Sequence, residues 1–152
     1  RASQVPTRWL DQGATQALQI LRVPSRLDSG LVERLIAGTV PDKTQWQAML
    51  RGPGEPVDLH AARERVLAGC AAGLESLREA RGTDAAVPTP EAEVASFTYP
   101  VTEYPERVRA VNLDKTPEAV GRLLGIKGQY LLLDTGVLNI RKYGGYDIEF
   151  SY

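Results

Sequence analysis

The sequence has too few cysteine and histidine residues to build a disulfide or a zinc site from those ligands alone. Its 152 residues include one cysteine, Cys70, and one histidine, His60. A single cysteine excludes an internal disulfide and is typical of a reducing compartment, so we expect a cytoplasmic location. Zinc is usually held by four cysteine or histidine ligands. A zinc site would therefore need help from carboxylates or from missing sequence.

Long apolar runs and a strong charge of one sign are also missing. No stretch approaches the roughly 20 apolar residues that span a bilayer, so we expect no membrane segment. The formal net charge is −1, so no overall field attracts a polyanion or an anionic membrane. The hydrophobic fraction of 43% and the charged fraction of 24% are those of an ordinary globular protein.

The first half of the chain has mainly helical periodicity. Apolar residues recur at spacings of three and four, the pattern of a helix with one buried face. Asp28-Ser29 and Asp58 stand where N-caps are expected. The predicted helices cover residues 8–18, residues 30–37, a short segment beginning at Asp42 or Thr44 that holds Trp46, and residues 59–80, whose buried stripe contains Cys70 as an inert core residue. Both tryptophans, Trp9 and Trp46, are expected in the core.

The second half changes to a period of two, which is typical of strands. One predicted strand, at residues 17–23, lies in the first half, and the others cover residues 96–101, 107–113, 120–126, 130–133, 137–140 and 146–152. Asp134-Thr135-Gly136 and Gly144-Gly145 separate the last three, and we expect positive φ at these turn glycines. The sequence thus predicts an α+β fold ending in an antiparallel meander or small barrel. The expected domains are 1–81, a linker at 82–95, and 96–152.

The terminal stretch LGIKGQYLLLDTGVLNIRKYGGY, residues 124–146, resembles the signature of a bacterial domain-of-unknown-function family, numbered 2797. The blocks QVPTRWLDQGA (4–14), SGLVERLI (29–36) and DKTQWQAML (42–50) agree with it. Members of that family carry upstream a cysteine-rich segment of the zinc-binding kind and a pair of strands. The resemblance therefore implies that this chain is an amino-terminally truncated member, with zinc only through the missing part.

The order of elements in the first half is also similar to the GIY-YIG nuclease fold. That fold has a helix with an early arginine, then a strand, then a helix bearing a glutamate. Carried over to this sequence, the arginine is Arg8, which would steady the scissile phosphate, and the glutamate is Glu33, which would hold Mg²⁺. Asp11 and Gln12 would complete a polar site beside Arg8. The tyrosine-bearing strands would lie upstream of residue 1.

Both positions also have an ordinary structural interpretation. Arg8 would be a surface residue of an exposed first turn. Glu33 lies in the first turn of its predicted helix, where a carboxylate favours the helix dipole.

The terminal stretch mixes basic and aromatic residues, as single-strand binders do. The candidates for nucleic-acid binding there are Lys127, Tyr130, Arg141, Lys142 and Tyr143. Against this interpretation, nearby acidic residues cancel the basic charge, and tyrosine is a favoured strand residue in its own right.

Two functions follow as hypotheses. The leading one is binding of nucleic acid, RNA or DNA, by a nuclease-derived fold, with Mg²⁺-dependent phosphodiester cleavage as its extension. The alternative is a non-catalytic protein-interaction or assembly module, which fits the near-zero net charge better.

Overall fold

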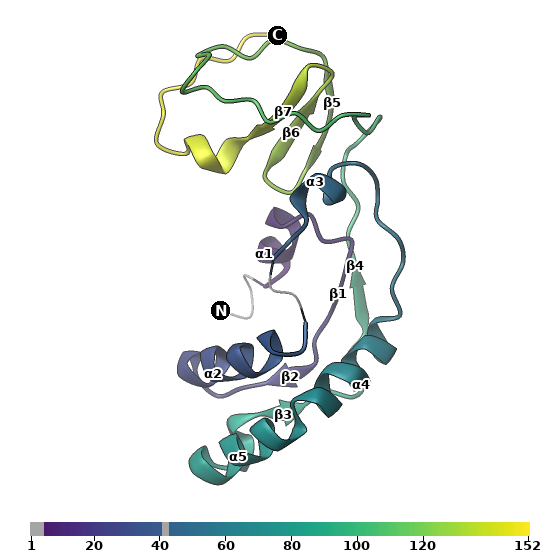
Figure 1. Cartoon of the computed structure of the whole chain (residues 1–152), viewed down its shortest axis with the longest axis vertical. Coiled ribbons are helices and arrows are strands. Elements are labelled where there is room, and N and C mark those ends of the chain that lie inside the picture. The colour runs from purple at the N-terminus through teal and green to yellow at the C-terminus, as the bar shows by residue number, and fades with distance from the viewer. Residues whose placement is uncertain (1–4, 41–42) are drawn as a thin grey trace. The chain divides into compact units, whose positions relative to one another are not determined.

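The computed structural model describes residues 5–40 and 43–152, and its contacts divide the chain into two units (Figure 1). The helical unit comprises Gln16–Thr44 and Glu55–Ser96. The meander unit comprises Arg1–Thr15, Gln45–Gly54 and Phe97–Tyr152. Each unit is thus assembled from segments that lie far apart in the sequence, whereas the sequence predicted three consecutive parts.

The helical unit consists of three long helices and two small antiparallel sheets. Strand β1 pairs with β4, and β2 pairs with β3. Its elements are β1 (Gln16–Leu18), β2 (Leu21–Arg22), α2 (Arg26–Ala37), α4 (Leu59–Gly69), α5 (Ala71–Arg81), the 3₁₀ helix η2 (Thr83–Ala85), β3 (Val87–Pro88) and β4 (Val94–Ser96). The strand expected over residues 17–23 therefore exists as two shorter strands in different sheets.

Helix α2 begins earlier than its sequence pattern indicates. Its N-cap is Ser25, whose hydroxyl oxygen accepts a hydrogen bond from the Asp28 amide at 3.2 Å. The cap expected at Asp28-Ser29 is therefore wrong. The Asp28 side chain is 2% exposed and accepts a hydrogen bond from Arg81 Nε of α5 at 2.5 Å. This ion pair joins the first turn of α2 to the last residue of α5.

The single long helix expected over residues 59–80 is two helices that meet at Cys70. Asp58 caps α4 as predicted, accepting from the Ala61 amide at 2.9 Å. At Cys70 the backbone leaves helical geometry, with φ −111° and ψ 11°. The Cys70 side chain is buried, as predicted, and burial raises the pKa of its thiol. A core cysteine of this kind is unreactive.

The core of the helical unit lies between α2, α4 and α5. Its buried residues are Val32, Cys70, Leu74 and Ala86. A Cβ added at Gly73 would lie 2.6 Å from Leu35 Cδ2, so this glycine permits the close approach of α5 to α2. Ala85 and Ala86 belong to the segment expected to be a linker, and both are fully buried. Residues 82–95 therefore pack as part of the unit rather than as a free connection.

The meander unit is built on a three-stranded antiparallel sheet of order β5-β6-β7. Its elements are α1 (Val5–Asp11), α3 (Trp46–Met49), β5 (Leu123–Lys127), β6 (Tyr130–Leu133), β7 (Gly136–Asn139) and the 3₁₀ helix η3 (Ile140–Tyr143). Helix α3 lies against the meander (Figure 1). The α+β class and the terminal meander are confirmed, but the sheet does not close into a barrel within the described residues.

Irregular segments cover both edges of this sheet. Val101 bridges to Gly125 of β5, and Ala110 bridges to Val137 of β7. A Cβ at Gly125 would lie 2.6 Å from Val101 Cα, so only glycine allows this approach. The strands expected over 96–101 and 107–113 are thus mostly reduced to single bridges. The segment 146–152 forms no strand.

The turn glycines behave differently from the expectation. Within the described residues, positive φ occurs at Gly13, Gly54, Gly82 and Gly128, and not at the glycines of the two expected turns. Gly128, with φ 59°, forms the β5–β6 turn. Gly13, with φ 74°, follows α1, which ends at Asp11 instead of continuing to residue 18.

The core of the meander unit joins α3 to the sheet. Its buried residues are Leu50, Leu124, Tyr130, Leu132 and Val137. Trp46 stacks on Tyr130 with ring centroids 5.8 Å apart and planes inclined by 5°. The expected core position of Trp46 is confirmed. Trp9, at 41% exposed, is a surface residue of α1, so that expectation is wrong.

The Asp28–Arg81 ion pair predicts an acid-sensitive helical unit. Arg81 and the Ser25 hydroxyl lower the pKa of Asp28 below its ordinary value of 3.8. The stability from this shift is present above pH 3.8 and is lost as pH falls through the lower folded value. We expect Asp28→Asn to lower the melting temperature at neutral pH and to weaken its dependence on pH below 4, measured by circular dichroism. The exposed Asp84→Asn is the control, and equal pH profiles for wild type and Asp28→Asn would contradict the assignment.

Candidate functional site

The two residues implied by the nuclease resemblance belong to different units. Arg8 lies on α1 of the meander unit and Glu33 lies on α2 of the helical unit, and both side chains are exposed. Within residues 5–40 and 43–152, neither side chain makes an ion pair or hydrogen bond. The structure thus does not bring the two together in one unit, and their catalytic roles stay predictions.

Three of the five terminal candidates for nucleic-acid contact are buried. Lys127 is 1% exposed, Tyr143 is 4% and Tyr130 is 9%. Tyr130 is covered by Trp46, and the Tyr143 hydroxyl accepts a hydrogen bond from the Leu113 amide at 2.9 Å. The side chains of these three residues are engaged inside the fold, and their contact with nucleic acid stays an untested prediction. The interleaving of basic and aromatic residues reflects packing at these positions.

Lys127 is a buried cation that neutral groups surround. Its Nζ donates hydrogen bonds to the carbonyls of Gly52 at 2.7 Å and Met49 at 2.9 Å. The ring centroids of Tyr104 and Tyr99 lie 5.2 and 5.8 Å from Nζ. Among the described residues no carboxylate pairs with it. Burial lowers the pKa of Lys127, while carbonyl oxygens and aromatic faces favour its charged form.

Lys142 is engaged in a polar network at the surface. Its Nζ donates to Asp114 Oδ2 at 2.7 Å and to the Tyr143 hydroxyl at 3.0 Å. The Tyr146 hydroxyl donates to the other oxygen of Asp114 at 2.5 Å. These bonds raise the pKa of Lys142 and lower that of Asp114. The network fixes η3 against the loop at Asp114, so the Lys142 charge is largely neutralised before any ligand arrives.

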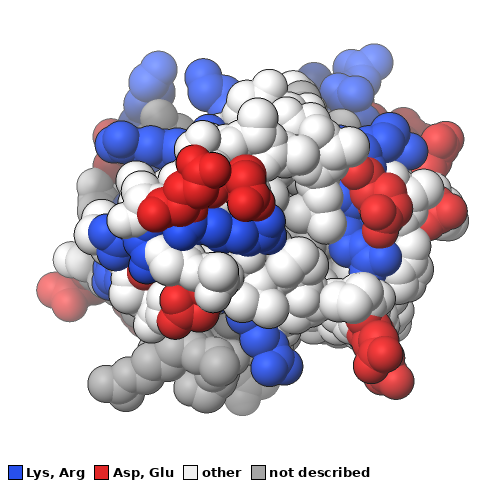
Figure 2. All heavy atoms as spheres, turned by 90° about the horizontal axis from the view of Figure 1, so that it is seen from below, with Lys and Arg blue, Asp and Glu red and all other residues white. Residues whose placement is uncertain are grey.

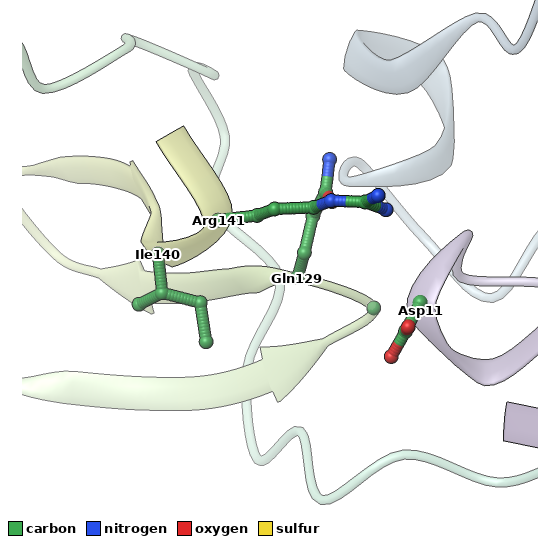
Figure 3. A pocket seen from close by; sticks show the side chains of 5 residues that line it. Asp11, Gln129, Ile140 and Arg141 are labelled. Atoms are coloured by element: carbon green, nitrogen blue, oxygen red, sulfur yellow. The ribbon is translucent and has the colours of Figure 1, made fainter. Parts of the chain in front are cut away.

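A pocket of about 280 Å³ lies between α1, the β5–β6 turn and η3 (Figure 3). It is lined by Asp11, Gly128, Gln129, Ile140 and Arg141. In Figure 3 the Arg141 side chain extends from η3 toward α1, where Asp11 lies. The polar side chains of this lining are thus a carboxylate, an amide and a guanidinium, and Ile140 adds an apolar one. Of these, Gln129 was not among the sequence candidates, because nothing in its local pattern separates it from an ordinary turn residue.

The pocket depends on a close approach of α1 to the β5–β6 turn. A Cβ added at Gly128 would lie 2.8 Å from the Asp11 carbonyl oxygen and 3.0 Å from the Gly13 nitrogen. The positive φ of Gly128 also favours glycine. Lys127 precedes this turn, and Tyr99, which faces Lys127, donates from its hydroxyl to the Ala14 carbonyl at 2.7 Å. The buried lysine thus contacts the groups that hold both walls of the pocket.

Charges of both signs are interspersed on the face seen in Figure 2, and no continuous basic area is visible there. This agrees with the net charge of −1. On that face, electrostatic attraction of a polyanion would depend on a few specific cations rather than on a broad field. Arg8 and Arg141 are two exposed cations of the meander unit whose side chains make no ion pair with a described residue.

No group of three histidine, cysteine, aspartate or glutamate side chains gathers within the described ranges to hold a metal ion. Glu33 is a single carboxylate, and the Mg²⁺ site expected there stays an untested prediction. In the same ranges, no helix is long and apolar enough to cross a membrane.

Lys127 can be tested by substitution. Lys127→Met keeps most of the side-chain volume but leaves the carbonyls of Met49 and Gly52 without their donor. We expect the free energy of unfolding to fall by about 1–3 kcal/mol, measured in urea. Because the folded pKa of Lys127 is lowered, the unfolded chain binds more protons just below pH 10.5. The stability advantage of wild type over the variant should therefore grow as pH rises toward 10.5.

The matched control is Lys115→Met, which removes an exposed lysine of the same unit. Equal unfolding curves for the two variants would show that the buried contacts of Lys127 contribute nothing.

Comparison with known proteins gives one family. No curated protein and no solved structure matches the chain. The sequence profile of the family described as "Protein of unknown function (DUF2797)" matches residues 1–148, nearly the whole length. This confirms the resemblance carried by the terminal signature and the three upstream blocks. The chain belongs to the DUF2797 family.

Proposed function

We propose that this protein binds nucleic acid and that the pocket of the meander unit is its contact with the strand. The observation that carries the proposal is the pocket itself, in which Arg141 stands with Gln129 and Asp11. Arg8 precedes Asp11 by three residues on α1, so the two lie on neighbouring positions of one helix face. Arg141 thus lines the pocket, and Arg8 lies on the helix that contributes Asp11 to it. Both guanidinium groups are exposed.

Guanidinium groups suit this role because of their geometry. Arginine presents planar, paired N–H donors that match the oxygens of a phosphate and stays charged at all relevant pH values. The lysines of the terminal signature are poor candidates by comparison. Lys127 is buried beneath Tyr99 and Tyr104, and Lys142 is bound to Asp114. The proposal therefore moves the phosphate contact from the lysines to Arg141 and Arg8.

Trp9 supports the same proposal from α1. It follows Arg8 directly and is 41% exposed. An exposed indole next to an arginine is the combination that single-strand binders use, with the ring stacking on a base and the cation on the backbone.

The alternative function, a protein-interaction module, is favoured by a different segment. Residues 146–152 alternate exposed apolar side chains with Asp147, Glu149 and Ser151, and they form no strand. Tyr146 is 53% exposed, Ile148 57% and Phe150 74%. Salt separates the two functions, because phosphate contacts weaken steeply as salt rises and an apolar interface barely responds.

The first test measures affinity for fluorescein-labelled single strands, as RNA and as DNA, over a series of salt concentrations. We expect Arg141→Ala to weaken binding and to lower the slope of log affinity against log salt by about one, since one phosphate contact is lost. Arg8→Ala should have a similar effect.

The control for this test is Arg107→Ala, which removes an exposed arginine of the same unit that does not line the pocket. Equal losses for Arg107→Ala and Arg141→Ala would remove the pocket from the proposal. If wild type binds no strand even at low salt, nucleic-acid binding is refuted.

Cleavage requires a separate test, because the described residues do not form a metal centre. The nuclease resemblance predicts Mg²⁺-dependent loss of a labelled strand that chelation stops. It further predicts that Glu33→Ala and Arg8→Ala reduce the rate by about a hundredfold. Denaturing gels of the wild type and both variants give the measurement. Equal rates for the three proteins would exclude both residues from catalysis, whatever the outcome of the binding test.

A further inference from the structure

We infer that the pocket of the meander unit binds a single unpaired guanine and that Arg141 contacts the flanking phosphate. The inference rests on the proposed function and specifies the ligand of the same site. It starts from a feature that general phosphate binding does not explain: the pocket contains a carboxylate, Asp11, as well as a guanidinium.

Asp11 constrains the ligand because it repels phosphate. A carboxylate accepts hydrogen bonds only, and an anion brought near it without a donor is disfavoured. Arg141, on the other wall, donates only. A ligand that satisfies both must present N–H groups at one end and negative charge at the other. A nucleotide whose base offers donors to Asp11 and whose phosphate reaches Arg141 has this arrangement.

Guanine is the base that fits such a carboxylate best. Its pairing edge carries two adjacent donors, the ring N1–H and the 2-amino group, which together match the two oxygens of one carboxylate. The next group along that edge is the O6 carbonyl, which accepts from an amide such as Gln129. Adenine, cytosine and uracil each offer only one donor group on their pairing edge: the 6-amino group, the 4-amino group and N3–H respectively. A bidentate pair of this kind discriminates between bases by about tenfold or more.

The dimensions and the lining agree with one base rather than a duplex. The volume of about 280 Å³ is slightly below the range of sites for drug-sized ligands. Ile140, 47% exposed, offers an apolar surface to the face of a ring. In a base pair, the pairing edge that Asp11 would contact is already hydrogen-bonded to the partner base. The guanine therefore has to be unpaired. Gly128 and the buried Lys127 fix the turn that carries Gln129.

The test compares two short labelled strands, an oligoadenylate and the same strand with one central guanine. Binding is measured by fluorescence anisotropy with the whole chain. We expect wild type to bind the guanine strand at least about tenfold more tightly. Asp11→Asn should abolish this preference and bind oligoadenylate at least as tightly as wild type does, because asparagine keeps one acceptor and loses the charge that repels phosphate. Gln129→Ala should reduce the preference less.

Asp147→Asn is the matched control, because it removes an exposed carboxylate of the same unit that lies outside the pocket. It should leave the preference unchanged, and circular dichroism checks that all variants fold. Equal affinity of wild type for the two strands overturns the guanine inference but leaves the proposed function standing. A preference that survives in Asp11→Asn overturns the role of Asp11. Absence of binding to both strands refutes the proposed function together with the inference.

Discussion

The meander unit depends on the burial of one positive charge. Moving an ammonium group out of water costs several kcal/mol even after relaxation, and a carboxylate partner would normally offset that cost. Lys127 has two carbonyl oxygens and two tyrosine rings around it instead. Because each of these groups holds only partial charge, the cation is stable only if all of them stay in place. The lysine therefore fixes the positions of segments that are distant in the sequence.

The consequence for the site follows from chain connectivity. Lys127 ends β5, and Gly128 and Gln129 form the turn that lines the pocket. Tyr99 links the cation to the residues after α1 through its hydrogen bond to Ala14. The helical unit also buries a charged side chain, the carboxylate of Asp28, and there a conventional ion pair with Arg81 neutralises it. An ion pair ties two helices at one point, whereas the carbonyl and tyrosine environment of Lys127 ties together three segments.

Local patterns in the sequence predicted some elements well. The apolar run of β6 was placed at residues 130–133, and Asp58 and Cys70 have their expected roles. The segment 146–152 has equally regular alternation, yet it forms no strand. Alternation shows only that a segment suits a sheet, and a strand also needs a free edge. Val101 and Ala110 already bridge to the outer strands β5 and β7. Which segment occupies a sheet edge depends on the tertiary fold, and the sequence of residues 146–152 does not indicate it.

The candidate site was predictable only in part for a similar reason. Sequence patterns treat lysine as exposed, because it is almost never fully buried without a partner. The groups that surround Lys127 include the backbone carbonyls of Met49 and Gly52. The position of a backbone carbonyl cannot be predicted from the pattern of side chains in a sequence. Arg141 and Asp11 were each noted separately, but their meeting in one pocket required the turn at Gly128. Arg141 and Asp11 were thus accessible to the sequence as single candidates, and their combination was not.

The combination also explains how a protein with almost no net charge could recognise a polyanion. A broadly basic surface gains affinity for every strand, and its binding carries little sequence information. One guanidinium opposed by one carboxylate gives weaker attraction but makes binding conditional on a base that satisfies Asp11. The carboxylate disfavours strands that offer only phosphate, in the way that repulsive elements give specificity at other interfaces. On this argument, the near-zero charge that first favoured a protein partner is equally compatible with selective binding of a few nucleotides.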